Sequence, residues 1–225
     1  MGSYATRTVL FDVDGTLVDS NLLHVDAWQR AFARCGVEVD SWRIHRAIGQ
    51  DSALLVESLA GDRDSAWVDE VKRLHAEYYG ELAPRLRRFD GVRQLLTALD
   101  GRGIRVVLAT SAPQDELRLL REAIDADAAI HAATSADDVD TAKPAPTLIE
   151  VALERAGAEA PEALFVGDST WDMIAAGRAG VTAYGLRSGG ISDGELRDAG
   201  ARAVYDDPAD LLAHLDELVG APTTT

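Results

Sequence analysis

Acidic residues follow two apolar runs of the sequence at short, regular spacings. Asp12 and Asp14 stand in the string FDVDGTLVD, and Asp168 and Asp172 stand in the string GDSTWD. Carboxylates two residues apart in an extended segment project from the same side. Beside a hard divalent cation, one such carboxylate can act as a nucleophile while the other handles a proton. A solvated Asp-Gly turn and a helix N-cap with a first-turn acid are the simpler interpretations of the two strings.

A hydroxyl pair and a lysine occupy comparable positions elsewhere in the chain. Thr110 and Ser111 follow the apolar run 106–109 and precede a helix that the pattern predicts to start near Pro113. A hydroxyl and the N–H groups of a helix start can bind phosphate, although an ordinary helix cap has the same composition. Lys143 also precedes a predicted helix, where a cation opposes the helix dipole. An anionic site would explain its position, and a solvated lysine is the alternative.

The chemistry requires a scaffold that brings these residues together. Apolar runs alternate with amphipathic helical patterns, which is typical of an α/β fold with a parallel, Rossmann-like sheet. The predicted strands cover residues 8–13, 104–110, 163–167, 182–185 and 201–205, with a weaker one near 129–134. Ligands of such sheets bind beyond the carboxyl ends of the strands. We therefore expect both acid pairs, the hydroxyls and the lysine to meet at that edge.

The alternation stops between about residues 22 and 88. This segment contains helical patterns without a convincing strand, and Trp28 and Phe32 lie on one of its apolar stripes. An insertion of helices directly after the first strand predicts a separate cap domain. The predicted domains are thus an α/β core of residues 1–20 and 89–225, and a helical cap domain of residues 21–88.

Composition limits the classes of function. The formal charge of −16 argues against sequence-independent nucleic-acid binding, which needs a basic surface. The sequence contains no apolar run long enough for a transmembrane helix, and its start has no pattern of a secretory signal. A single cysteine, Cys35, excludes an internal disulfide and fits a reducing compartment. We expect a cytoplasmic protein without membrane or nucleic-acid partners.

The strings described above resemble, in order, the four motifs of the haloacid dehalogenase superfamily. The helical insertion resembles the cap of its phosphoglycolate phosphatase and β-phosphoglucomutase group. The resemblance implies a Mg²⁺-dependent phosphatase in which Asp12 attacks phosphorus and becomes phosphorylated. Asp14 would protonate the leaving oxygen and then activate water. The metal ligands would be the Asp12 carboxylate, the Asp14 main-chain carbonyl and Asp168, with Asp172 in support.

The same resemblance assigns the substrate contacts. Thr110 and Lys143 would bind the transferring phosphoryl group, and Ser111 belongs to the same phosphate cradle. In the insertion, the loop with Gly49 and Gln50 resembles the cap loop that faces substrate in this group. The sequence assigns no role to three further residues of the insertion, which are His24, Lys72 and His75.

Several related functions compete with a phosphatase acting on a small phosphorylated metabolite. Dehalogenases of the superfamily lack an aspartate at the position of Asp14, because a departing halide needs no proton. A β-phosphoglucomutase-like mutase tends to carry a basic residue near Ser52, and none stands there. A phospho-acceptor signalling domain and a non-catalytic binding protein are alternatives of a different class. The sequence does not separate a monomer from a homodimer.

Overall fold

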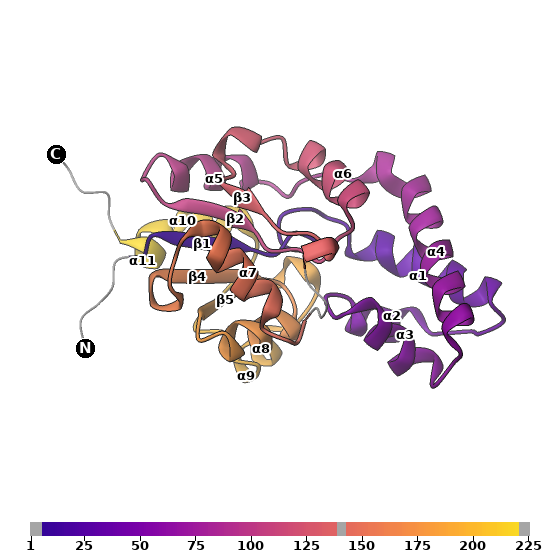
Figure 1. The fold of residues 1–225 in the computed structure, drawn as a ribbon. Helices are drawn as coiled ribbons and strands as arrows, with labels where there is room; N and C mark the ends of the chain where they lie inside the picture. Colours follow the sequence, from indigo (N-terminus) through magenta and orange to yellow (C-terminus); the bar gives the residue numbers. More distant parts are fainter. Residues whose placement is uncertain (1–5, 139–142, 221–225) are drawn as a thin grey trace. The chain divides into compact units, whose positions relative to one another are not determined.

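The protein is described by a computed structural model that covers residues 6–138 and 143–220. Six parallel strands form one sheet in the order β3-β2-β1-β4-β5-β6 (Figure 1). The strands are β1 (Thr8–Phe11), β2 (Arg105–Leu108), β3 (Ala132–Ala133), β4 (Ala163–Gly167), β5 (Thr182–Leu186) and β6 (Val204–Tyr205). The prediction of a parallel, Rossmann-like α/β sheet is confirmed.

The strands differ from the prediction mainly at their ends. Strand β1 ends at Phe11, two residues before the predicted end, because the chain turns directly afterwards. The carbonyl of Val13 accepts hydrogen bonds from the N–H groups of Leu17 (2.8 Å) and Val18 (3.0 Å), which closes a turn in place of a ladder. Val13 is nonetheless fully buried, so the apolar run continues beyond the strand. Strands β2, β3 and β6 are shorter than predicted, and β5 is one residue longer.

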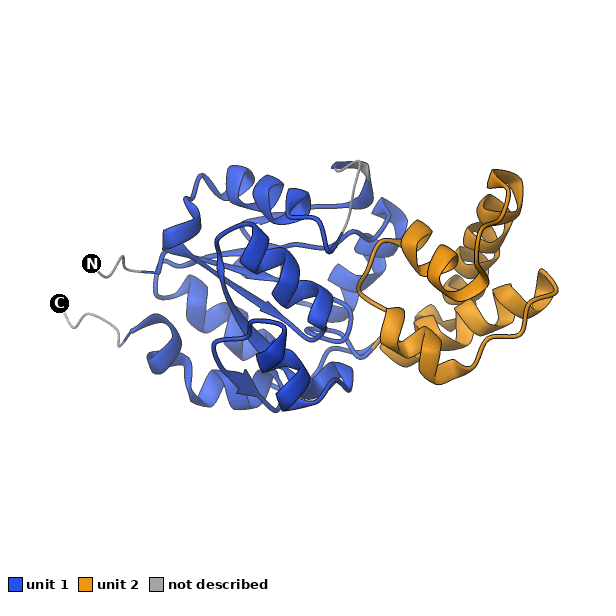
Figure 2. Cartoon of the chain, turned by 90° about the horizontal axis from the view of Figure 1, so that it is seen from below, with its two compact units in different colours: residues 1–19, 87–225 blue, residues 20–86 orange. Residues whose placement is uncertain are grey.

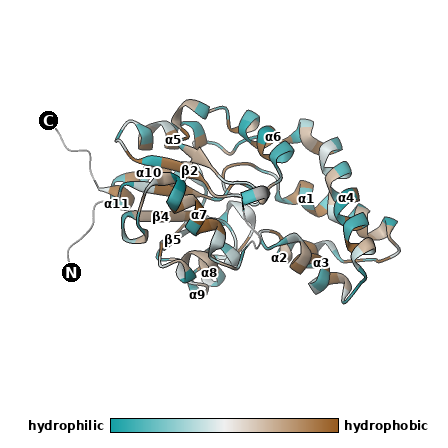
Figure 3. Ribbon diagram, viewed as in Figure 1, coloured by the Kyte–Doolittle hydropathy of each residue, from teal (hydrophilic) through white to brown (hydrophobic). Residues whose placement is uncertain are grey.

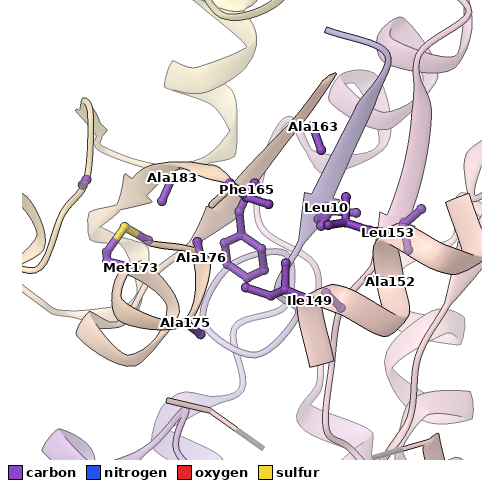
Figure 4. Close-up of a cluster of buried hydrophobic side chains, with 14 of the residues drawn as sticks. Leu10, Ile149, Ala152, Leu153, Ala163, Phe165, Met173, Ala175, Ala176 and Ala183 are labelled. Carbon is purple, nitrogen blue, oxygen red and sulfur yellow. The ribbon is translucent and has the colours of Figure 1, made fainter. Parts of the chain in front are cut away.

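Helices cover the sheet and bury its apolar side chains. They are α5 (Val92–Asp100), α6 (Gln114–Ile124), α7 (Thr147–Ala156), α8 (Thr170–Arg178), α9 (Asp193–Asp198), α10 (Pro208–Ala213) and α11 (Leu215–Val219). In one core cluster, Leu10 of β1 and Phe165 of β4 face Ile149 of α7 and Met173 of α8 (Figure 4). Burying each such side chain contributes about 1.5–3 kcal/mol. This packing fixes the central strands that carry the acidic strings.

The chain divides into two compact units, one of Met1–Asp19 with Arg87–Thr225 and one of Ser20–Leu86 (Figure 2). The first, the core unit, contains the sheet. The second, the helical unit, contains α1 (Asn21–Arg34), α2 (Ser41–Ala47), α3 (Ser52–Ala60) and α4 (Ser65–Leu82). Hydropathy alternates along helices such as α5 (Figure 3), as amphipathic packing requires. None of the helices in the described part of the chain combines the length and apolar character needed to cross a bilayer.

The two chain segments that lead into and out of the helical unit pair with each other. Val18 and Arg88 form an antiparallel bridge, and the N–H of Asp19 donates to the carbonyl of Arg87 at 2.9 Å. The Arg87 guanidinium also contacts the Asp19 carboxylate at 2.9 Å. The helical unit therefore begins and ends at adjacent points of the core unit's backbone.

Candidate active site

Asp12 directly follows the central strand β1, at the carboxyl edge of the sheet. Phe11 is in register with Leu108 of β2 and with Val166 of β4, so the carboxyl ends of all three strands lie at that edge. The N–H of Asp12 donates to the carbonyl of Val166 at 2.9 Å, which holds the residue in line beyond the strand. The side chain of Asp12 is buried. Asp14 lies in the following turn and is half-buried, and both Asp12 and Asp14 come after the end of β1, which the sequence predicted to reach residue 13.

Lys143 forms ion pairs with two of the acids. Its Nζ contacts Oδ1 of Asp12 and lies 2.6 Å from Oδ1 of Asp172. The lysine is 2% exposed, which is rare for this residue type outside a paired, functional setting. Helix α7 starts at Thr147, so Lys143 precedes the helix, as the sequence predicted. The buried carboxylates account for its position.

Burial and the ion pair shift the pKa values of Asp12 and Lys143 in opposite directions. Burial raises the pKa of Asp12 to about 7; Lys143 opposes that rise, while Asp172 and Asp14 add to it. Burial alone would lower the pKa of Lys143, but Asp12 and Asp172 together hold it above its ordinary value. The lysine therefore stays charged, and further positive charge beside Asp12 would favour the ionised carboxylate.

Asp168 and Asp172 are held by their own strand-to-helix turn between β4 and α8. Ser169 caps α8: its hydroxyl accepts from the N–H of Asp172 (3.2 Å), and its N–H donates to Asp172 Oδ2 (3.0 Å). The hydroxyl of Thr16 lies 3.1 Å from Asp168 Oδ1 and 3.3 Å from Asp12 Oδ2. Thr16 thereby links the two acid-bearing strand ends.

Gly167 makes room for Asp172 at the end of β4. A Cβ built on Gly167 would lie 2.6 Å from Asp172 Cγ, closer than any side chain tolerates. The glycine is thus required by the approach of the carboxylate that pairs with Lys143.

The buried acids fit a divalent cation. Carboxylate oxygens of Asp12, Asp168 and Asp172 lie within 4.8 Å of one another, and all three residues are buried. Two ligands of an octahedral Mg²⁺ lie about 3 to 4.2 Å apart, so these carboxylates can reach one ion after they move closer together. Among the described residues, one ammonium group, that of Lys143, is ion-paired with this cluster. The ionised cluster therefore has an excess of negative charge that a dication would neutralise.

The predicted hydroxyls lie at the end of β2. Thr110 is buried, and its Oγ1 accepts from the N–H of Ala112 at 3.0 Å. This bond leaves the hydroxyl proton of Thr110 available for a further acceptor. Ser111 is half-buried, and α6 starts three residues later at Gln114, with Pro113 at its N-cap position. Both hydroxyls follow β2 at the edge where Asp12 follows β1.

The remaining predicted residues belong to the helical unit. Gly49 and Gln50 lie in the loop between α2 and α3, where Gly49 has a φ of 91° that favours glycine. His24 is buried, and its Nδ1 lies 3.1 Å from Nε2 of His75. Burial and the neighbouring His24 lower the pKa of His75 well below its ordinary value. Substrate contact by Gly49 and Gln50 stays a prediction.

Lys72 and His75 both lie on α4, and both are half-buried. The His75 ring stacks on Trp28, with ring centroids 3.9 Å apart. The histidine pair thus has a packing role within this unit.

Three residues near the acids were not singled out from the sequence. Thr16 lies within the first acidic string, where its contact with Asp168 depends on the pairing of β1 with β4. Ser188 and Gly189, after β5, carry no motif that could have identified them. Only the fold brings them to this edge of the sheet.

Solved structures with the same fold cover nearly the whole chain. A hydrolase from Pseudomonas syringae is 37% identical with a TM-score of 0.91, and the match covers 95% of this chain and 100% of that one. CbbY from Rhodobacter sphaeroides, solved in complex with phosphate, is 25% identical with a TM-score of 0.75, covering 94% and 99%. The fold and the acidic strand ends therefore define a hydrolase whose core is a parallel, Rossmann-like α/β sheet.

Sequence comparisons identify the family. The phosphoglycolate phosphatase of Rhodospirillum rubrum is 33% identical over 226 residues, which cover 96% of this chain and 92% of the relative. The model of the haloacid dehalogenase-like hydrolases matches residues 9–186, more than half of the chain. The chain belongs to the haloacid dehalogenase-like hydrolase family, and it is an enzyme of the phosphatase type.

Proposed function

We propose that this enzyme hydrolyses a small phosphomonoester in two steps, through an aspartyl-phosphate on Asp12, with Mg²⁺ as cofactor. The observation that supports this most directly is the Asp12 carboxylate, which is buried between the Lys143 ammonium and two further acids. A carboxylate held this way has one cationic partner in place and needs a second to ionise fully. A phosphoryl-transfer site has the same requirement, because its substrate is also an anion.

The metal ligands proposed are the Asp12 and Asp168 carboxylates and the main-chain carbonyl of Asp14. Asp172 would act in support, since Ser169 holds its Oδ2 and Lys143 contacts its Oδ1. When bound, Mg²⁺ would keep Asp12 ionised and offset the negative charge of the phosphoryl oxygens. Asp172 would thus lie behind the direct ligands and help to fix their positions, as supporting residues do in other metal sites.

In the first step, an Asp12 oxygen forms a bond to phosphorus while the bond from phosphorus to the alcohol oxygen breaks. Asp14 donates its proton to that leaving oxygen. In the second step, Asp14 takes a proton from water, which attacks phosphorus and releases inorganic phosphate and free Asp12. The half-exposed position of Asp14 suits proton exchange with solvent.

Lys143, Thr110 and Ser111 are proposed to bind the transferring phosphoryl group. The Lys143 ammonium is already fixed beside Asp12, so its position costs little reorganisation when charge develops. The hydroxyl of Thr110 can donate to a phosphoryl oxygen while still accepting from Ala112.

We propose phosphoglycolate, or a sugar phosphate of similar size, as the substrate class. The proposal rests on the relatives named as phosphoglycolate phosphatases and on the loop with Gly49 and Gln50 in the helical unit. A phosphomutase is disfavoured, since Ser52 and its neighbours offer no basic residue for a second phosphate. Conversion of a sugar phosphate into its isomer without release of phosphate would instead favour the mutase.

Metal removal gives the direct test of this function. We expect the purified enzyme to release inorganic phosphate from phosphoglycolate or p-nitrophenyl phosphate with Mg²⁺, and to lose that activity in EDTA. Adding Mg²⁺ in excess should restore the activity. Without the dication, the negative charge of the acid cluster repels an anionic substrate. The measurement is phosphate release across a panel of small phosphorylated metabolites. Full turnover in EDTA would contradict the proposed metal site.

Asp14→Asn is expected to lower steady-state turnover by about 10²–10⁴-fold, the usual contribution of a general acid–base group. The first step with p-nitrophenyl phosphate should survive, since p-nitrophenolate leaves without a proton. Rapid-mixing measurements should therefore show a burst of about one p-nitrophenolate per enzyme, followed by slow turnover. Steady-state turnover equal to that of the wild type would remove the acid–base role of Asp14.

A further inference from the structure

The turn that follows β5 contacts the acidic loop, defined here as residues 12–19. This turn is a short 3-10 helix, Arg187–Gly189. The hydroxyl of Ser188 donates to the carbonyl of Gly15 at 2.7 Å, across 173 residues of sequence. Gly15 has a φ of 75° and directly follows Asp14. The bond therefore fixes the peptide group next to the one that carries the Asp14 carbonyl.

The same turn lies against the Asp168 carboxylate. A Cβ built on Gly189 would lie 1.6 Å from Oδ2 and 2.4 Å from Cγ of Asp168. Since a side chain cannot approach so closely, the Cα of Gly189 forms one wall of the space that holds this carboxylate. Thr16 contacts the other carboxylate oxygen, Oδ1, at 3.1 Å. Asp168 is thus held between the turn and the acidic loop.

The sheet holds the turn in place. Strand β5 pairs with β4 in the register Gly167↔Gly185, so Arg187–Gly189 leaves the sheet at the edge where Asp168 follows β4. An ion pair of Arg187 with Asp206, at 2.5 Å, adds a surface contact of small energy. The strand pairing is therefore the main constraint on the position of the turn.

We propose that the turn Arg187–Gly189 is a positioning element that sets the proposed metal ligands relative to one another. Ser188 fixes the backbone after Asp14, and Gly189 sets the place of the Asp168 carboxylate. The inference rests on the proposed function, because it takes Asp168 and the Asp14 carbonyl as ligands. Groups behind metal ligands typically contribute 10- to 100-fold in metal affinity. Ser188 and Gly189 act through other residues and do not touch the substrate.

Ser188→Ala tests the hydroxyl. We expect the dissociation constant for Mg²⁺, measured by calorimetry without substrate, to rise about tenfold. The Mg²⁺ concentration for half-maximal phosphate release should rise by the same factor, whereas the rate at saturating Mg²⁺ should fall far less. The matched control is Ser192→Ala, which removes the exposed N-cap hydroxyl of α9 from the same segment. That control should bind Mg²⁺ like the wild type.

Gly189→Ala tests the close approach, with Gly194→Ala as its control, since a Cβ on Gly194 meets nothing within 4 Å. We expect Gly189→Ala to weaken Mg²⁺ binding more than Ser188→Ala does, and Gly194→Ala to leave it unchanged. Thermal melting in EDTA shows whether each variant is folded. Wild-type Mg²⁺ affinity in folded Ser188→Ala and Gly189→Ala overturns the inference.

Asp168→Asn separates this outcome from failure of the proposed function. Loss of Mg²⁺ binding in Asp168→Asn, together with unchanged binding in both turn variants, contradicts only the positioning role. Equal Mg²⁺ binding by the wild type and Asp168→Asn contradicts the metal site itself, and the inference with it.

Discussion

Asp12→Asn is expected to lower phosphate release by a factor on the order of 10⁴ or more, the scale on which nucleophile removal acts in covalent catalysis. The amide is nearly isosteric with the carboxylate but is a far weaker nucleophile toward phosphorus. No phosphoenzyme can then form. Phosphate release under saturating substrate and Mg²⁺ measures the loss, and trapping of a beryllofluoride adduct on the wild type but not on the variant locates it.

The matched control for this substitution is Asp19→Asn. Asp19 lies in the same acidic loop, but its carboxylate is partly exposed and paired with Arg87. We expect that variant to retain activity within about twofold, as surface ion pairs contribute little. In EDTA, Asp12→Asn should melt at or above the temperature of the wild type, because it removes a buried carboxylate that lies beside Asp172. Unchanged turnover in Asp12→Asn would falsify the nucleophile assignment.

Lys143→Met is expected to reduce kcat/KM by about 10³-fold, since it removes a fixed charge from the position where the phosphoryl group would bind. It should also destabilise the protein by about 3–5 kcal/mol in EDTA, because it leaves Asp12 and Asp172 buried without their common cation. Denaturant unfolding measures the second effect. Methionine has a similar length, so lost packing contributes little.

The double variant Lys143→Met with Asp172→Asn separates the two effects. Removing one of the carboxylates left behind should recover part of the stability while leaving the activity low. If stability and activity recover together, the lysine acts only through folding and the proposed contact with the phosphoryl group is wrong.

The fold was predictable from the sequence because burial and local pattern agree in its central strands. Strand β4, with its apolar run buried on both faces, was predicted with its exact bounds. The end of β1 was not, since Val13 is as apolar and as buried as a strand residue while its carbonyl already closes a turn. A strand ends where its backbone hydrogen bonds to the neighbouring strands end, and the hydrophobicity of the residues does not indicate that position.

The candidate site was predictable as a set of residues but not as a set of contacts. The sequence indicated two acid pairs and a lysine at one edge of the sheet. It gave no reason to expect Lys143 between Asp12 and Asp172, because that contact depends on how β1, β4 and the segment before α7 meet. The close approach of Gly189 to Asp168 is a further contact of this kind. Such contacts join segments that are far apart in the chain, and no pattern in the sequence indicates that these segments meet.

The antiparallel bridge between Val18 and Arg88 has a consequence for how such enzymes diversify. Bridged residues have Cα atoms about 5 Å apart, a gap that a two-residue hairpin can close. The segment between Val18 and Arg88, which contains the helical unit, can thus be lengthened, shortened or replaced while the strands that precede the acidic residues keep their positions. A different insertion at this one point would therefore change what surrounds the substrate, while the acidic residues after β1 and β4 stay on the same strands.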